Sequence, residues 1–560
     1  MGVSLLKYFG ILFVFLCHFA CFSEEASPHH IIYTAQQGNV KAAFGLYQRY
    51  CEEIGHQDFE VLQKVALAAI TKGMLSHDPE EQLLSIFGAG VSLHEQCFGI
   101  LKRALASSNP QLQVTALHFL AQQQDDRADM ALAEAMSSNF FLIRLEAAYF
   151  LAAKRHAQAV GQIESLMCKV DESLHPLFPQ LYAIHGSADA LALLRRQLNA
   201  PQSAVRLEAI LSVAAHGHDV LLPYIRTLAD QLLPQQQEAC ATTLGILSDS
   251  DSIPRLLRLA DSPTLIVKLA ALQGLYRLGL EQKRIDIEDI AKEGHPFAIS
   301  MLGEMPGSEE TLITLLEDDN YQVKINAGIA LLDRQNEHCL PTMMDILIRD
   351  SRDLALALTA SHGGSLSAWK TIPSAQQNFK DNPAMYELSI RAKEQLLMKA
   401  ARLPEKSFLK LACHLFDSHQ NDLIPTLVRL LEDLNTPDAI DILKKYQQQL
   451  GSPFIRNYCN LALYRLKEAG PYADILKTWI AQQQDVELIR FRPLLPWKQQ
   501  KDSSIYHLTP QETSRLLVES FESLAQARDQ DSLHVLVDAI QYGNEKNSFA
   551  LSGLLLRAMQ

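Results

Sequence analysis

The stretch NAPQSAVRLEAILSVA at residues 199–214 decides the fold, because its pattern returns at 261–279 as DSPTLIVKLAALQGLYRLG. Each copy begins with a turn containing Asn, Asp or Pro. An apolar and then usually a basic residue follow, before an Ala-rich stretch with apolar residues at helical spacing. Four further copies lie at 108–121, 138–152, 318–333 and 451–466. Self-similarity of this kind predicts a repeat protein rather than a chain of separate globular domains.

The register of the copies gives the period. The anchor is the residue after the apolar position, and successive anchors are Thr115, Arg144, Arg206, Lys268 and Lys324. The two central steps are both 62 residues, and a weaker copy with Gln237 at the anchor lies halfway along the second. A period near 31 fits two helices of roughly 12 residues and two short turns. One such pair cannot bury its own apolar stripe, so the sequence predicts an all-α solenoid of stacked antiparallel helix pairs.

Composition excludes several other classes of protein. The chain has 560 residues, of which 48% are hydrophobic, with only 25 Gly and 23 Pro, so collagen-like and disordered chains are excluded. It carries 50 Lys and Arg against 64 Asp and Glu, and no long run is markedly basic. Binding to a phosphate backbone needs a basic footprint, so we expect no nucleic-acid partner. The acidic balance favours solubility and names no partner.

The N-terminal segment predicts export. Residues 1–23 contain Lys7, an apolar stretch from Tyr8 to Phe22, and small residues at positions −3 and −1 of a cleavage after Ser23. The stretch is short for a membrane span, which favours a secretory signal over an uncleaved anchor. Acylation of Cys21 as a lipid anchor is the second possibility. No later segment is apolar for 18 residues, so we expect no transmembrane span after signal removal and a periplasmic or cell-envelope location.

The cysteines predict packing rather than cross-linking. Beyond residue 23 there are seven, widely separated and without a CxxC pair, whereas disulfide frameworks and zinc sites show clusters. We therefore expect buried thiols that behave as small hydrophobic side chains.

The repeated motif resembles that of the HEAT-repeat proteins, in particular the short bacterial HEAT repeats typified by phycobilisome lyases. The matching residues are Val205, Arg206 and Ala209, and Val267, Lys268 and Ala271. The resemblance is good over 108–333 and weaker over 400–470. It implies a right-handed superhelical solenoid with a period of about 31, and says little about function.

The resemblance also implies a ladder of hydrogen bonds between the turn and the following basic residue, joining adjacent repeats. Here the pairs are Asp261 with Lys268, Asp318 with Lys324, and Asn139 with Arg144; Arg206 occupies the same position in its copy. The alternative is that Arg144, Arg206, Lys268 and Lys324 form an anion-binding stripe.

The repeats and their interruptions divide the chain into six segments. They are a signal peptide at 1–23, an N-terminal helical cap at 24–100, HEAT-like repeats at 101–350, an irregular loop-bearing segment at 351–390, further helical repeats at 391–490, and a loop with C-terminal capping helices at 491–560. The apolar end, Ala550 to Met559, is expected to dock onto the preceding repeat. A hinge near 361–387 is the alternative to one rigid superhelix.

Two stretches rich in Pro or Gly, at 361–387 and 491–512, interrupt the helical pattern, and each contains a tryptophan. Trp369 and Trp497 are therefore candidate partner-binding residues, because aromatic side chains often anchor interfaces. The alternative is that each folds back and caps an exposed end of the stack.

Catalytic signals are sparse. His216, His218 and Asp219 surround a Gly in a turn, which favours a solvated turn over a metal site. Gly88 and Gly90 lie in apolar sequence and favour a helix-packing or turn site over a phosphate loop. No hydrolase, metalloprotease, P-loop or dinucleotide motif is present. We therefore expect an exported, non-enzymatic scaffold that binds a protein partner and holds no cofactor. The alternative is a HEAT-like enzyme of the lyase or glycosylase type.

Overall fold

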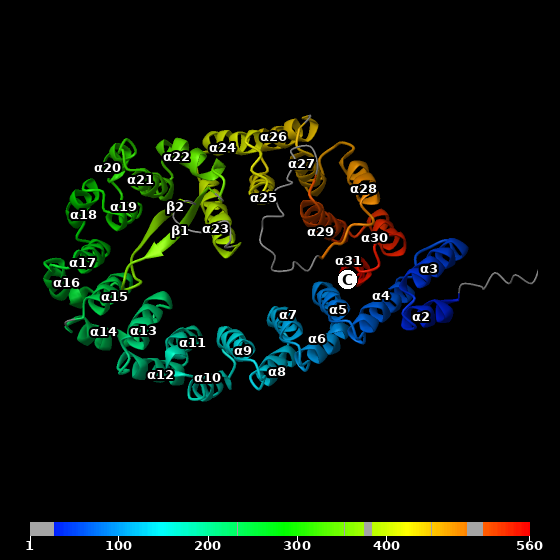
Figure 1. Ribbon diagram of the computed structural model, residues 1–560, viewed down its shortest axis with the longest axis horizontal. Coiled ribbons are helices and arrows are strands. Elements are labelled where there is room, and N and C mark those ends of the chain that lie inside the picture. The colour runs from blue at the N-terminus through cyan, green and yellow to red at the C-terminus, as the bar shows by residue number, and fades with distance from the viewer. Residues whose placement is uncertain (1–26, 232, 352, 374–382, 450, 490–507) are drawn as a thin grey trace, which may run out of the picture. The chain divides into compact units, whose positions relative to one another are not determined.

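The chain consists of helices that form two compact units. The computed structural model describes residues 27–231, 233–351, 353–373, 383–449, 451–489 and 508–560 (Figure 1). Unit 1 comprises Met1–Ala131, Lys477–Arg490 and Leu517–Gln560, and unit 2 comprises Leu132–Leu476 and Phe491–Leu516. The predicted signal peptide and Cys21 lie outside the described residues. No helix in the described part of the chain combines the length and the apolar character that a membrane span requires.

Unit 1 combines the first helices of the chain with the last. Its helices are α2 (Pro28–Gln36), α3 (Val40–Ile54), α4 (Phe59–Met74), α5 (Pro79–Ser92), the 3-10 helix η1 (Glu95–Cys97), α6 (Phe98–Leu105), α7 (Pro110–Ala121), α30 (Gln530–Tyr542) and α31 (Asn547–Ala558). A boundary between the units falls within each of α8 (Asp126–Ala135), α28 (Tyr472–Gln482) and α29 (Pro510–Ala527).

The C-terminal helix α31 packs on α5 and α4 as well as on its neighbour α30. The prediction that this apolar end docks onto the preceding repeat was therefore incomplete, because the end also packs on the N-terminal helices α4 and α5. Glycines allow this close approach: a Cβ on Gly553 would lie 2.1 Å from the carbonyl oxygen of Gly88. The predicted helix-packing role of Gly88 is thus confirmed. An ion pair of 2.8 Å between Lys546 and Glu80 lies at the edge of this contact.

Unit 2 stacks helix pairs in two rows (Figure 1). The outer row contains α10 (Ala159–Met167), α12 (Ala188–Leu198), α14 (Leu222–Ala229), α16 (Ile253–Ala260), α18 (Lys283–Lys292) and α20 (Glu309–Leu315). The inner row contains α9 (Phe141–Ala153), α11 (Phe178–His185), α13 (Ser203–Ala215), α15 (Pro234–Ile246), α17 (Leu265–Arg277), α19 (Pro296–Leu302) and α21 (Tyr321–Asp333). Short 3-10 helices join several of them, at η2 (Glu172–Leu177), η3 (Asp219–Leu221), η4 (Ser250–Ser252) and η5 (Glu337–Cys339). The predicted all-α architecture of stacked helix pairs is confirmed; the handedness of the superhelix stays a prediction.

The backbone shows the period of 31 directly. Each inner helix from α9 to α17 is followed by a residue with a positive φ. These residues recur every 31 positions, at Arg155, Gly186, Gly217, Ser248 and Gly279. A left-handed residue terminates a helix and turns the chain back toward the next one. Glycine adopts this conformation without steric cost, so three of the five positions carry it.

The inner helices approach each other closely in the middle of the stack. A Cβ added to Gly245 of α15 would lie 2.5 Å from the Cα of Gly274 in α17. The central turns of α17, from Leu269 to Leu275, are buried. A helix that is buried around most of its circumference needs apolar or small residues on every side, which explains why these helices are rich in Ala and Leu.

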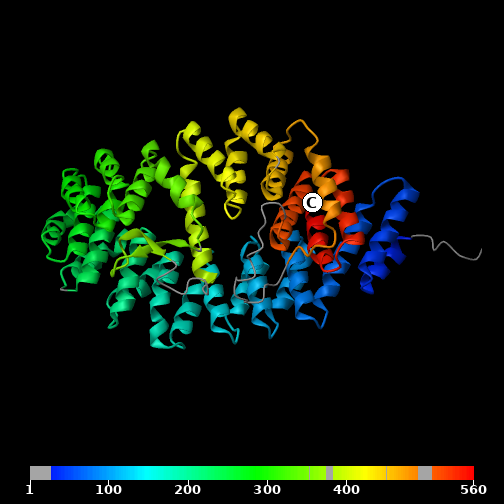
Figure 2. The same ribbon diagram turned by 45° about the horizontal axis from the view of Figure 1, so that its top comes forward.

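A two-stranded hairpin stands where the sequence analysis expected irregular loop. Strands β1 (Leu354–Ala360) and β2 (Ser367–Pro373) pair antiparallel, with Leu358 opposite Trp369. Figures 1 and 2 show the hairpin on the inner side of the row from α15 to α21. The loop prediction was wrong for these residues, because long-range contacts stabilise an extended conformation that the local Gly and Pro residues did not reveal.

The remaining helices of unit 2 follow the hairpin or precede it directly. They are α22 (Leu340–Ile348), α23 (Pro383–Ala400), α24 (Glu405–Asp417), α25 (Ile424–Leu434), α26 (Pro437–Gln448) and α27 (Pro453–Arg465). They continue the predicted helical repeats beyond residue 391.

Candidate functional site

Both edges of the hairpin are bonded to helix side chains. Asn326 of α21 donates to the carbonyl oxygen of Trp369 at 2.9 Å and accepts from the N–H of the same residue at 2.9 Å. Gln322, one turn earlier, accepts from the N–H of Thr371 at 3.0 Å. On the other edge, the N–H of Leu356 donates to Ser389 Oγ in α23 at 3.1 Å. Exposed strand edges promote aggregation, and here side-chain partners satisfy them.

The tip of the hairpin is held by one buried carboxylate. Glu238 of α15 is 2% exposed and accepts hydrogen bonds from the hydroxyls of Ser361 and Ser365 and from the N–H of Gly363. The bonds from Gly363 and Ser365 measure 3.0 and 2.8 Å. Ser365 is bonded in turn to Thr242, one helical turn after Glu238. The hairpin is therefore fixed at its tip as well as along its edges.

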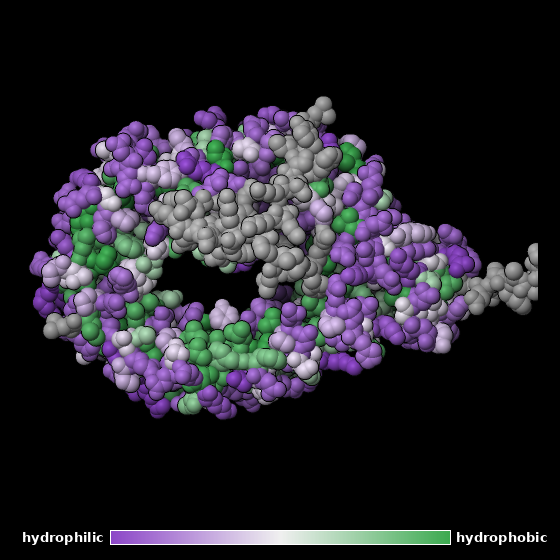
Figure 3. Space-filling view, in the orientation of Figure 1, coloured by the Kyte–Doolittle hydropathy of each residue, from purple (hydrophilic) through white to green (hydrophobic). Residues whose placement is uncertain are grey.

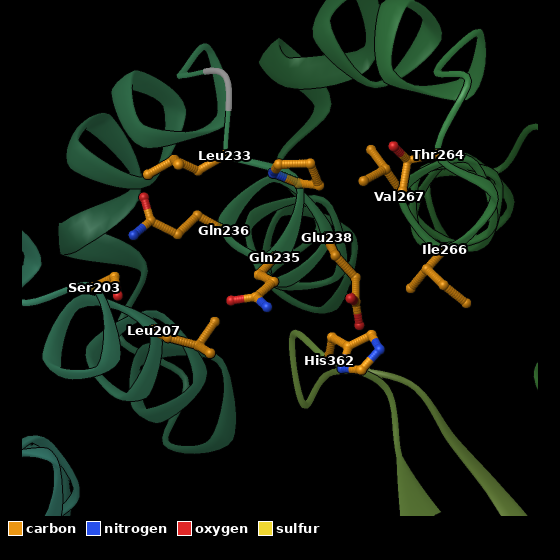
Figure 4. Close-up of a pocket in the computed structure, with 11 residues that line it drawn as sticks. Ser203, Leu207, Leu233, Gln235, Gln236, Glu238, Thr264, Ile266, Val267 and His362 are labelled. Carbon is orange, nitrogen blue, oxygen red and sulfur yellow. The ribbon is translucent and has the colours of Figure 1, made fainter.

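A pocket of about 360 Å³ lies beside the tip, where α13, α15 and α17 begin (Figure 4). Its lining consists of Ser203, Leu207, Leu233, Pro234, Gln235, Gln236, Glu238, Thr264, Ile266, Val267 and His362. The walls are mostly aliphatic, and the polar groups gather where Glu238 faces the hairpin tip (Figure 4). Binding pockets commonly combine apolar walls with a few such polar groups.

Apolar side chains also recur at the N-terminal ends of successive inner helices. We call this set the apolar edge; it consists of Phe140, Leu142, Leu177, Leu233 and Leu265, which are between 37% and 67% exposed. The inner helices of a stack run in the same direction, so their N-terminal ends share one edge. Figure 3 shows apolar side chains gathered over α9 and α11. At the matching place α13 has Ser203 and Ala204, and there the edge adjoins the pocket.

Trp369 lies in β2 and is only 8% exposed, so its indole packs inside unit 2. The hairpin that carries it lies along the inner side of the stack and not at an end of it, so the predicted alternative of an end cap does not describe this placement. Trp497 lies outside the described residues, and its predicted role in partner binding stays a prediction.

The basic residues of the predicted ladder bond mainly to backbone. Arg144 donates to the carbonyl of Ser138 at 2.9 Å, and Arg206 donates to the carbonyl of Pro201 at 2.9 Å. With the Gln236 amide oriented to satisfy both groups, its oxygen accepts two bonds of 3.0 Å from Arg206, which joins α13 to α15. These hydrogen bonds stabilise the turns that precede the inner helices.

The acidic members of the predicted ladder do not meet their basic partners. In the described part of the chain, Lys268 and Lys324 form no hydrogen bond or ion pair with Asp261 and Asp318. Asp318 instead accepts from the N–H of Asn320 at 2.7 Å. The lysines lack the forked guanidinium with which Arg206 reaches both its own turn and the next repeat.

A different set of ion pairs joins adjacent repeats. Arg255 of α16 contacts Asp230, in the turn after α14, through two bonds of 2.9 Å. Arg226 of α14 reaches Asp249, in the turn after α15. The hydrogen bonds from Arg255 and Arg226 hold the pKa values of Asp230 and Asp249 below their usual range. Sequence analysis missed these pairs because the partners lie 23 to 25 residues apart, without a shared motif.

One of the candidate metal residues, His218, contributes to the packing of repeats. His218 Nε2 donates to the carbonyl of Ala183 in the preceding repeat at 2.7 Å. Burial and the neighbouring His218 lower the pKa of His216. Within the described ranges, no three His, Cys, Asp or Glu side chains lie close enough together to hold a metal ion.

The buried cysteines are free thiols, and burial raises the pKa of Cys240, Cys459 and Cys339, the last to about 12. A thiol with such a pKa is a poor nucleophile at neutral pH, which suits packing.

Glu238 and Asn326 are the functional residues that the motif analysis did not single out. The anchor at Gln237 places Glu238 where the neighbouring repeats have Leu207 and Leu269. A carboxylate at a position that is apolar in adjacent repeats could have identified Glu238 as a candidate from the sequence.

The chain is built of helix pairs that recur every 31 residues, and successive pairs stack through their inner helices. These features decide the class of repeat. The repeats of this chain are HEAT-like. No protein family model and no curated protein matches the chain.

Solved helical-repeat structures match the chain only remotely. The complex of CpcE and CpcF of phycocyanin lyase from Nostoc matches 38% of this chain and 92% of its own, at 18% identity and a TM-score of 0.30. Karyopherin Kap121p bound to Ste12p matches 95% of this chain and 66% of its own, at 13% identity and a TM-score of 0.38. This chain thus spans about two thirds of the karyopherin, and likeness at this level carries no conclusion about function.

Proposed function

We propose that this protein is an exported, non-enzymatic scaffold that binds a partner protein along the apolar edge. The recurrence of exposed Leu and Phe side chains at the start of several inner helices carries the proposal. Exposed apolar surface costs free energy in water unless a partner covers it, and contiguous patches of it mark interaction sites. The repeat architecture supports the same function, since stacked repeats present extended binding surfaces.

The hairpin limits where such a partner can bind. It covers the inner side of α19 and α21 and reaches α15, and its edges and tip are bonded to these helices or to α23. The inner surface of those repeats is therefore occupied by the chain itself. The N-terminal ends of α9 and α11 carry no such cover from the hairpin, so the partner is expected there.

Export belongs to the proposal as well. The pattern of residues 1–23 supports it, with release after Ser23 or acylation at Cys21 as the two outcomes of processing. Mass spectrometry of the mature N-terminus from separated cell fractions distinguishes them. Recovery of the whole protein in the cytoplasm with residues 1–23 intact would contradict export.

Site-specific crosslinking tests the binding surface. A photoreactive amino acid at Leu142 or Leu177 is expected to crosslink one partner protein in the intact cell envelope, and Leu142→Glu should reduce crosslinking from position 177. Ile285 of α18 is the matched control, because it is 52% exposed and lies on the outer row. Equal crosslinking of that partner from position 285 would overturn the assignment of the surface.

A further inference from the structure

Glu238 is a buried carboxylate without a positively charged partner. Its three hydrogen-bond donors, two hydroxyls and one backbone N–H, are all neutral. Among the described residues no Lys, Arg or His forms an ion pair with it. Burial of a carboxylate costs several kcal/mol unless hydrogen bonds and opposite charge offset it. The neutral donors offset a part of this cost.

Three donors among the described residues reach the carboxylate, which leaves one of its acceptor positions unused by them. An ionised carboxylate offers about four lone-pair sites on its two oxygens. Ser361 and Ser365 both donate to Oε1, whereas Gly363 alone donates to Oε2. The free position is therefore on Oε2, and Glu238 belongs to the lining of the pocket.

The lining of the pocket suits a long basic side chain. Leu207, Leu233 and Ile266 provide aliphatic walls, and the carboxylate lies toward the hairpin tip (Figure 4). Basic side chains pack their aliphatic stem on apolar surface and place the charge beyond it. A guanidinium also offers several donors, and the amide of Gln235 lines the same pocket.

Two positively chargeable groups of the chain lie near this site. Arg206 is already bonded to backbone carbonyls and to Gln236. His362 at the hairpin tip is exposed, and Figure 4 shows its ring beside the Glu238 carboxylate.

We propose that this pocket binds the side chain of an arginine in a partner polypeptide that lies along the apolar edge. The inference rests on the proposed function, because the edge supplies the surface on which the rest of the polypeptide packs. The stem of the arginine contacts Leu207, Leu233 and Ile266, and its guanidinium donates to Glu238 Oε2. The net charge of −14 favours a basic partner segment in addition.

A pair of matched peptides tests this inference on the full chain. Acetyl-Leu-Arg-Leu-amide and the same peptide with citrulline differ only in charge at nearly constant shape. Titration calorimetry at pH 8 should show the arginine peptide binding at least about tenfold more tightly, as expected for a charge-assisted bond in a low-dielectric pocket. Equal affinity of the two peptides overturns the proposal.

Substitution of Glu238 itself could disrupt the hairpin, so the pocket is tested with substitutions that leave Glu238 in place. Ile266→Trp fills the pocket without removing a hydrogen bond of Glu238 and should abolish binding of the arginine peptide. Ile285→Trp, at a 52% exposed position of the outer row, is the matched control and should bind like wild type. Unchanged affinity in Ile266→Trp would contradict the assigned site. If position 142 crosslinks a partner but the two peptides bind with equal affinity, the arginine pocket is contradicted and the proposed function still holds.

Discussion

The carboxylate of Glu238 and the backbone N–H of Gly363 are joined by a hydrogen bond of 3.0 Å that spans 125 residues of sequence. It connects a helix in the middle of the stack to the tip of a hairpin that begins several repeats later. Because Ser361 and Ser365 bond to the same carboxylate, removal of this side chain would leave three donors of the tip without their partner.

Glu238→Ala should therefore loosen the hairpin and lower the free energy of unfolding by about 2–3 kcal/mol, since unsatisfied buried donors cost 1–3 kcal/mol each and water reaches some of them. Urea unfolding measures the change, and hydrogen exchange of residues 354–373 localises it. Glu208→Ala, at an exposed position of α13, is the control and should change the free energy by less than about 0.5 kcal/mol. Unaltered exchange at the tip in Glu238→Ala would show that the bond does not hold the hairpin.

Asn326→Ala should release β2 from α21. The asparagine side chain bonds to both backbone groups of Trp369. Its loss leaves the N–H unpaired at a buried position and the carbonyl bonded to Gln322 alone, at a cost of about 2 kcal/mol. In a background with Phe at positions 479 and 497, the emission of Trp369 should shift to longer wavelength as the indole gains water. Lys370→Ala, at an exposed position in the same strand, should leave the emission unchanged. The same spectrum in Asn326→Ala and wild type would argue against the clamp.

Gly245→Ala should destabilise unit 2 through a steric clash. The added Cβ would lie 2.5 Å from the Cα of Gly274, and backbone cannot move aside as a side chain can. Overpacking of this kind costs about 1–3 kcal/mol. Gly161→Ala in α10 is the control, because nothing lies within 4 Å of its added Cβ. Replacing Gly by Ala inside a helix should stabilise the protein by up to about 1 kcal/mol. A lower melting temperature for Gly245→Ala and a higher one for Gly161→Ala would therefore verify the close approach.

The helix pairs could be predicted from sequence because their signals are local. The apolar spacing of residues 199–214 and the turn residues near Asp261 and Asn320 lie within the elements that they specify. The step of 31 between Gly186 and Gly217 reflects the same local repeat in the backbone. Each repeat thus encodes its own turn and its own apolar stripe.

The hairpin could not be predicted in this way because its partners are distant. Residues 354–360 read LALALTA, and such a small apolar run is equally compatible with a helix. The contacts with Asn326, Glu238 and Ser389 select the extended conformation. The inter-repeat pairs, such as Arg255 with Asp230, were hidden for the same reason.

Acidification should weaken the repeat stack through Asp249. The hydrogen bond from Arg226 lowers the pKa of this carboxyl in the folded state, so its contribution is present above the unfolded pKa, about 3.9, and is lost as the pH falls through the lower folded value. Asp249→Asn should remove about 2 kcal/mol at pH 7 and flatten this acid dependence. Urea unfolding of both proteins between pH 2.5 and 7 measures the free energy of unfolding and its acid dependence. Asp251→Asn, whose side chain is 80% exposed, is the control and should largely retain the slope.

Lys393 of α23 should give a pH dependence of the same sign, but in the alkaline range. Its side chain is 2% exposed, its ammonium group donates to the carbonyl of Arg349, and burial lowers its pKa from 10.5 to about 8. The unfolded chain therefore binds this proton more tightly, so the contribution to stability rises with pH between about 8 and 10.5, by about 3 kcal/mol. Lys393→Met should be more stable than wild type at pH 7, with the difference shrinking across that range. Lys399→Met, on the same helix but more exposed, should leave the slope of wild type unchanged. Parallel stability curves for wild type and Lys393→Met between pH 8 and 10.5 would mean that the lysine is hydrated in the folded protein.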